Sequence, residues 1–163
     1  MASYLTAALL ILASIAFVSG RPSIREELVT GTPFIIRSVQ GGLLLKSLGG
    51  GQHCKGAGHV VTSNYVENAV SATWIYQSLG PWATFSTSGG DFYLNEFTFH
   101  PEGPFCYPGG RSVTLVWHEE GTVSFENHDG TCLNNNGNGE RISWTSCDGY
   151  SPSQRWNLEK TLQ

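Results

Sequence analysis

The amide side chains between Asn134 and Glu140 form a dense group of hydrogen-bonding residues in the sequence. A side-chain amide both donates and accepts hydrogen bonds, so this tract can contact the hydroxyl groups of a polyol. The same composition, with Gly137 and Gly139 interspersed, is also typical of a turn that uses left-handed backbone conformations. The tract therefore predicts either a turn or a site for a polyhydroxylated molecule.

Acid/base or metal chemistry has weaker support in this sequence. His118 is followed by Glu119 and Glu120, but successive strand residues point to opposite faces, and no second carboxylate partner can be assigned. Motifs for a nucleophilic serine, a zinc helix or a phosphate-binding loop are absent. The histidines also lack the spacing of metal ligands. We therefore expect no enzyme activity, no catalytic residues, no metal and no cofactor. The histidines are His53, His59, His100, His118 and His128.

The composition excludes two broad classes of protein. Only 13% of the 163 residues are charged and 12% are aromatic, whereas disordered chains combine high charge with few aromatic residues. The formal net charge is −4, with no run of like charges, and a nucleic-acid binder needs a basic face to neutralise phosphates. We expect a folded protein that does not bind nucleic acid.

The first 20 residues carry no charged side chain, and residues 5–18 are almost entirely apolar. This run is too short to span a bilayer, which takes about 20 residues. The small residues before Arg21 are typical of a signal-peptidase site. We expect a signal peptide over residues 1–20, a secreted, extracellular protein, and no membrane span.

Secretion exposes the four cysteines to an oxidising compartment, where disulfides form. Four cysteines allow three connectivities. Cys132 and Cys147 flank a short segment, which favours their pairing and leaves Cys54 with Cys106. We expect two disulfides.

Apolar residues alternate at period two in many short runs, as in half-buried strands, and no window keeps helical spacing. Glycine-rich turns separate the runs. The sequence therefore predicts an all-β protein. The clearest runs are Val113/Leu115/Trp117, Val123/Phe125, Ile142/Trp144 and Trp156/Leu158.

An internal period identifies the arrangement of these strands. Trp74, Trp117 and Trp156 are spaced at intervals of 43 and 39 residues, and Leu94 and Leu133 each precede the next tryptophan by 23 residues. Three units of about 40 residues, each with four short strands, are the pattern of a β-trefoil, a six-stranded barrel capped by three hairpins. We expect this domain over residues 32–163, with 21–31 as an N-terminal arm; a two-sheet sandwich is the structural alternative.

The C-terminal 40 residues carry three sequence marks: Gly130-Thr131-Cys132-Leu133, a second cysteine at Cys147 after an apolar strand, and Gln154-Arg155-Trp156. With these marks the third unit resembles a ricin B-type (R-type) lectin repeat. The resemblance implies a non-catalytic carbohydrate-binding module whose partner is a glycan or glycoprotein.

In that family the glutamine of Gln-X-Trp helps to fix an acidic side chain that binds sugar hydroxyls, and an aromatic ring stacks on the sugar. The resemblance puts Gln154 on the glutamine, Asn134 on the acidic residue, Thr145 on the aromatic and Ser153 on an asparagine. Trp144 lies one residue from the aromatic position and, by period two, faces either the core or, as a displaced platform, a sugar. These five residues are the candidate carbohydrate site, in a degenerate form.

The first two units lack the equivalent residues. In the second unit Asn95 follows Leu94, but Leu115 replaces the glutamine; in the first, Leu45 and Ala72 take the corresponding places. The third unit is therefore the expected location of the sugar site.

A second hypothesis concerns the Pro- and aromatic-rich loop at residues 100–110, which contains Cys106. Prolines and a disulfide stiffen a loop, so it loses little entropy on docking. The Kunitz-type soybean trypsin inhibitors are also secreted β-trefoils with two disulfides. Protease inhibition or protein recognition through this loop is the alternative function, with a protease or a toxin subunit as the alternative partner.

Overall fold

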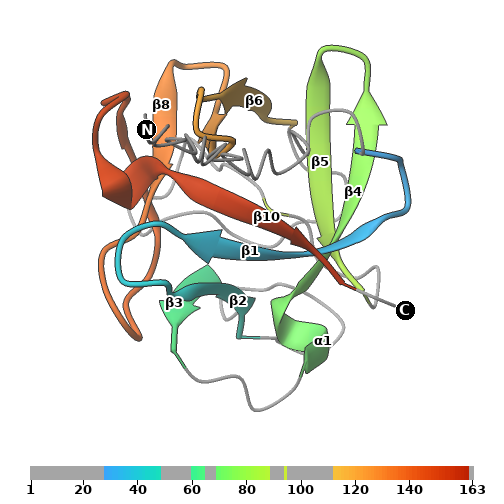
Figure 1. Cartoon of the computed structure of the whole chain (residues 1–163), viewed down its shortest axis with the longest axis horizontal. Coiled ribbons are helices and arrows are strands. Elements are labelled where there is room, and N and C mark those ends of the chain that lie inside the picture. Colours follow the sequence, from blue (N-terminus) through green and yellow to red (C-terminus); the bar gives the residue numbers. More distant parts are fainter. Residues whose placement is uncertain (1–27, 49–59, 65–68, 89–93, 95–111, 162–163) are drawn as a thin grey trace, which may run out of the picture.

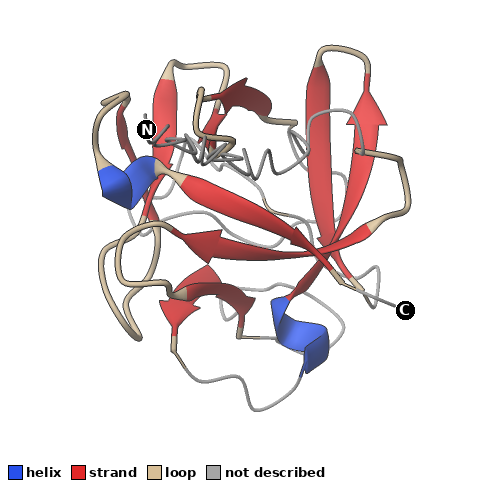
Figure 2. Cartoon of the chain, viewed as in Figure 1, coloured by secondary structure: helices blue, strands red, loops and turns tan. Residues whose placement is uncertain are grey.

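The computed structural model describes residues 28–48, 60–64, 69–88, 94 and 112–161. Figure 2 shows that strands dominate this part of the chain, with one short α-helix and one 3-10 helix. The elements are β1 (Pro33–Ser38), β2 (Leu44–Ser47), β3 (Val60–Ser63), α1 (Ala69–Ala72), β4 (Thr73–Leu79), β5 (Trp82–Thr87), β6 (Thr114–Trp117), β7 (Val123–Glu126), β8 (Thr131–Asn134), β9 (Ser143–Ser146), η2 (Pro152–Gln154) and β10 (Trp156–Lys160).

Six of the strands close a barrel. Going round it, β1 pairs with β4, β4 with β5, β6 with β7, β7 with β10, and β10 with β1, all antiparallel. An isolated bridge between Ala83 and Val113 joins β5 to the start of β6 and completes the ring. Figure 1 shows β1 and β10 side by side across the middle of the molecule.

Hairpins extend from the barrel at two places in the described residues. The β2–β3 hairpin belongs to the first repeat and the β8–β9 hairpin to the third. The first repeat thus consists of β1 to β4 and the third of β7 to β10, while β5 and β6 begin and end the second. Residues 95–111, between β5 and β6, lie outside the described residues. The predicted all-β fold and β-trefoil architecture are confirmed.

Aromatic side chains from all three repeats fill the barrel. Tyr76 packs edge-on against Phe85, Phe85 against Phe125, and Phe125 against Trp156, with ring centroids 5.6, 5.3 and 6.2 Å apart. Trp74 and Trp156 are fully buried, and Trp117 is partly buried against the same cluster. Burying such large apolar surfaces is the main stabilising contribution to a fold with so little helix.

The two buried tryptophans also show which residues of the first and third repeats are equivalent. The Trp156 indole donates to the Leu133 carbonyl at 3.2 Å, and the Trp74 indole donates to the Leu45 carbonyl at 2.9 Å. Leu45, and not Leu44, is therefore the structural equivalent of Leu133 in the first repeat. Lys46 then takes the place of Asn134 there, because it follows Leu45 as Asn134 follows Leu133. The separation from this leucine to the tryptophan is 29 residues in the first repeat and 23 in the third.

The predicted bridge between Cys132 and Cys147 is present, with the two Cα atoms 4.9 Å apart. It links β8 to the end of β9 and so ties the two strands of the third hairpin together. The other expected bridge, Cys54–Cys106, lies outside the described residues.

At the N-terminal edge of the described chain, Leu28 packs against the core and the Gly31 amide donates to the Tyr76 carbonyl. The expected signal peptide (1–20) and residues 21–27 of the arm lie outside the described residues. Within the described part of the chain, no helix is long and apolar enough to cross a membrane.

Candidate functional site

The β8–β9 hairpin arranges the predicted site residues on two faces. Asn134 lies opposite Ser143, Cys132 opposite Thr145, and Leu133 opposite Trp144. Because side chains alternate along a strand, Asn134, Ser143 and Thr145 share the outer face, while Leu133 and Trp144 share the inner one. The hairpin therefore presents amide and hydroxyl groups outward.

A continuous set of hydrogen bonds links Asn134 and Ser143 of the hairpin to three polar residues of the neighbouring loops and of η2. We call these five residues the polar row. The Asn134 side-chain amide accepts from the Ser153 hydroxyl and donates to the side-chain oxygen of Asn136, both at 2.7 Å. Asn136 in turn donates to the Ser143 hydroxyl at 3.0 Å. At the other end, the Ser151 and Ser153 hydroxyls lie 2.7 Å apart. The polar row consists of Ser151, Ser153, Asn134, Asn136 and Ser143.

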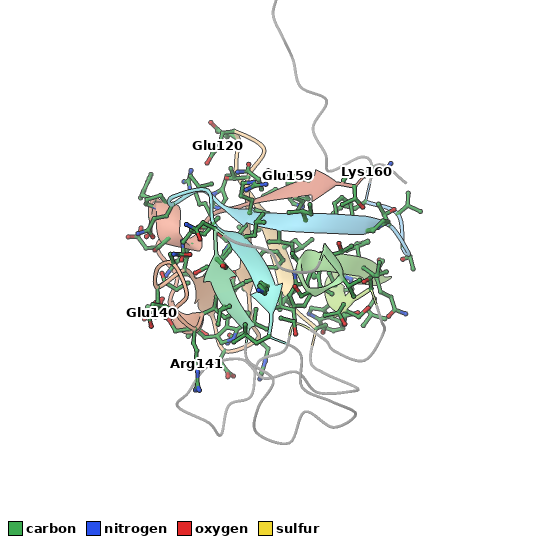
Figure 3. The ribbon with its side chains drawn as sticks, turned by 90° about the horizontal axis from the view of Figure 1, so that it is seen from below. Glu120, Glu140, Arg141, Glu159 and Lys160 are labelled. Atoms are coloured by element: carbon green, nitrogen blue, oxygen red, sulfur yellow. A yellow bond between two sulfur atoms is a disulfide. The ribbon has the colours of Figure 1, made fainter. Side chains whose placement is uncertain are left out.

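The polar row contains no charged side chain. Figure 3 shows Glu140 and Arg141 pointing outward from the loop between β8 and β9, and Glu120 on another part of the surface. The row can therefore offer uncharged donors and acceptors, the groups that bind hydroxyls, with an amide in place of a carboxylate at Asn134.

Gln154 is buried and positions the edge of the site. Its amide donates to the Thr145 hydroxyl at 2.8 Å and to the Ser146 carbonyl at 2.9 Å, and its oxygen accepts from the Asp148 amide at 2.7 Å. In the described structure Asn134 is thus held by Ser153, while Gln154 holds Thr145 and the start of the next loop.

Trp144 lies on the inner face of the hairpin. Its ring packs against the hydrophobic core, and its buried indole nitrogen has no hydrogen-bond partner. This orientation follows from the register with Leu133, which is fully buried. The structure therefore separates Trp144 from the outward residues Asn134, Thr145 and Ser153.

The asparagine tract divides into different roles. Asn135 is buried, and its amide bonds to the Thr62 and Ser38 hydroxyls and to the Gln40 carbonyl in the first repeat. Asn136, its neighbour, is exposed in the polar row. The sequence alone could not separate these roles because both residues have the same type and the same local context.

Tyr150 was not among the predicted site residues. It lies on the loop between β9 and η2, next to Ser151, and 91% of its surface is exposed. Turn-forming residues surround this position in the sequence, with Asp148-Gly149 before it and Ser151-Pro152 after it. This composition predicts a loop with an aromatic ring at its tip.

The base of this loop is held by an ion pair. Arg155 donates to Glu120 and, through two of its nitrogens, to the Gly149 carbonyl. The backbone amide of Glu120 and the Thr122 hydroxyl lower the pKa of the Glu120 carboxyl, and Arg155 adds to this effect. The loop that carries Tyr150 is therefore anchored to the β6–β7 turn.

His118 lies close enough to the Arg155–Glu120 ion pair to interact with both charges. Its Nε2 is 2.8 Å from the Ser124 hydroxyl, which itself donates to the Gln154 carbonyl, so the Nε2–H is the donor to Ser124. Burial lowers the pKa of His118, and the Arg155 charge lowers it further, while Glu120 opposes the shift. No group of three metal-ligating side chains occurs among the described residues.

The lowered pKa of His118 predicts how stability changes with pH. The unfolded chain binds the proton near the ordinary pKa of about 6.5, and the folded chain binds it only at lower pH. Below pH 6.5 the unfolded state therefore holds more protons, and stability falls as the pH falls toward the folded pKa. Urea unfolding at pH 7.5 and 5.5 should show a larger loss for the wild type than for His118→Gln. Equal losses in the two proteins would contradict this assignment.

The alternative hypothesis, protease inhibition or protein recognition, rests on residues 100–110, which lie outside the described residues. His53, His59 and His100 also lie outside the described residues.

No protein-family model and no curated protein matches the sequence. Solved structures, however, share its fold. The designed three-fold symmetric protein ThreeFoil is 17% identical with a TM-score of 0.65, and the match covers 79% of this chain and 99% of that one. The ricin B-like lectin of Macrolepiota procera, solved with lactose, is 12% identical with a TM-score of 0.67, over 82% and 99%.

A salivary protein of Culex quinquefasciatus, described as a member of the Cysteine and Tryptophan-Rich family, is 17% identical with a TM-score of 0.65, over 82% of this chain and 96% of that one. Larger enzymes are also among the similar structures, and the chain spans 33% of one and 30% of another. The fold is thus a β-trefoil, and similar folds occur in a lectin and within longer enzymes.

Proposed function

We propose that this chain is a secreted, non-catalytic carbohydrate-binding module, with a degenerate sugar site in the third repeat. The observation that carries the proposal is the polar row, where hydroxyl and amide groups are fixed by mutual hydrogen bonds on the outer face of the β8–β9 hairpin. Groups held in place before binding lose little entropy when a ligand hydroxyl joins them.

Two features indicate that the affinity is low. Asn134 carries no charge, and charge-assisted hydrogen bonds are about twice as strong as neutral ones. Both ends of its amide already have partners, Ser153 and Asn136. Thr145, at the position of the family's stacking ring, offers only a hydroxyl and a methyl group. Sugars therefore compete with existing contacts and gain no stacking at that position.

A gain-of-function variant tests the proposal. In the double variant Asn134→Asp/Thr145→Trp, a carboxylate and a ring return to the family's positions. We expect its affinity for galactose or N-acetylgalactosamine to exceed that of the wild type at least tenfold, because both contacts act on the same sugar. The measurement is a glycan array, followed by titration calorimetry.

Two further variants complete this experiment. Asn134→Ala should weaken any wild-type binding, while Asn157→Ala, which removes an amide from the distant strand β10, should leave it unchanged. An array without signal for both the wild type and the double variant would refute the proposed site.

A further inference from the structure

The proposed sugar site lacks a ring at Thr145, and the ring of Trp144 packs inward. Among the described residues with an exposed aromatic ring, Tyr150 is the one next to the polar row. Its neighbour Ser151 contacts Ser153, and Ser153 contacts Asn134. Ser151, the residue after Tyr150, is thus joined to Asn134 through two hydrogen bonds.

From this arrangement we propose that Tyr150 is the stacking platform of the site and that its ligand is an uncharged saccharide. The inference rests on the proposed carbohydrate-binding function and adds a binding residue and a ligand class to it. A tyrosine ring can cover the apolar face of a pyranose, while the row beside it bonds to the sugar's hydroxyls.

The loop that carries Tyr150 is unusually well fixed for an exposed segment. The Tyr150 amide donates to the Asp148 carboxylate at 3.0 Å, the Asp148 amide donates to Gln154 at 2.7 Å, and Cys147 before it is bridged to Cys132. Arg155 binds the Gly149 carbonyl from the other side. A ring displayed from such a loop loses only its own side-chain freedom on binding, which favours stacking.

The charges around Tyr150 select the ligand class. Asp148 and Glu120 are negative, and Arg155, the cation that contacts this loop, already binds Glu120 and Gly149. The residual charge beside the ring is therefore negative, and the described residues there offer no unpaired cation to a sulfate or carboxylate. An anionic sugar is repelled, whereas a neutral sugar is not.

The test uses the full mature chain, with lactose and N-acetylgalactosamine as probes and titration calorimetry as the measurement. Tyr150→Ala should weaken binding about tenfold, because the ring is lost. Tyr150→Phe should stay within twofold of the wild type, because the ring remains. Trp82→Ala removes another exposed ring, on the β4–β5 turn, and should change nothing. Both positions are exposed, so all three variants should fold normally.

The possible outcomes separate this inference from the proposed function. If Asn134→Ala abolishes binding while Tyr150→Ala stays within twofold, the platform is refuted and the sugar site stands. Equal losses in Tyr150→Phe and Tyr150→Ala would show that the hydroxyl acts rather than the ring, which also refutes stacking. A loss in Trp82→Ala would refute a localised platform. If the wild type binds neither probe, the platform is overturned; if Asn134→Asp/Thr145→Trp binds neither probe as well, the proposed function is also overturned.

A second titration tests the ligand class. We expect 3′-sialyllactose to bind at least threefold more weakly than lactose, with a smaller difference in 0.5 M salt, because salt screens the repulsion from Asp148 and Glu120. Equal or tighter binding of the sialylated sugar would overturn the assignment to uncharged saccharides.

Discussion

Replacement of Trp156 by alanine is expected to lower the free energy of unfolding by about 3–5 kcal/mol, the usual cost of truncating a large buried aromatic residue. Trp156 is fully buried, packs edge-on against Phe125 and donates its indole N–H to the Leu133 carbonyl. Truncation therefore opens a cavity, removes an aromatic contact and leaves a buried carbonyl without its partner. Domains of this size are stable by only about 5–15 kcal/mol, so the loss is a large share of the total.

Urea unfolding of the purified variant measures this effect, and two other substitutions serve as controls. Trp74→Ala should cost a similar amount, because Trp74 makes the equivalent hydrogen bond to Leu45 in the first repeat. Trp82→Ala should cost less than about 0.5 kcal/mol, because half of its surface is already exposed. If Trp156→Ala and Trp82→Ala were equally stable, the assignment of Trp156 to the barrel core would be wrong.

Replacement of Asn135 by alanine is expected to lower the free energy of unfolding by about 2–4 kcal/mol. The Asn135 amide bonds to Thr62, Ser38 and Gln40 of the first repeat and accepts from the Gly137 amide. Alanine leaves several of these polar groups buried without a partner, and each such group costs about 1–3 kcal/mol. The variant thus weakens the contact between the first and third repeats.

Asn136→Ala is the matched control, since it removes the same amide from the next position. Asn136 is exposed, and water can replace its partners, so its loss should cost less than about 1 kcal/mol. Chemical denaturation of both variants measures the difference. Similar stabilities for Asn135→Ala and Asn136→Ala would refute the role of Asn135 as a buried link between repeats.

The repeat pattern was readable from the sequence because it depends on burial. Trp74, Trp117 and Trp156 recur at intervals of 43 and 39 residues. The spacing is similar because each repeat contributes one large ring to the shared barrel core. The alternation of side chains along a strand likewise predicted that Trp144 and Thr145 lie on opposite faces of the hairpin. The Cys132–Cys147 pairing also followed from the sequence, because a short loop brings the two ends of one hairpin together.

The hydrogen-bond partners of the polar side chains could not be predicted from the sequence. A hydrogen bond depends on distances of a few tenths of an ångström between segments far apart in the sequence. Gln154 therefore binds Thr145 and Asp148, and Ser153 takes the position beside Asn134. Neither the residue types nor their spacing distinguishes these partners.

The sequence by itself thus determined the strand periodicity, the three-fold repeat and one local disulfide, because these features arise from burial and short chain separation. The tertiary structure decided that Asn135 joins two repeats while Asn136 faces outward, and that Trp144 packs inward while Tyr150 stands exposed beside the polar row. These outcomes depend on which distant segments the closed barrel brings together, since each polar group must find its partner there or remain open to solvent.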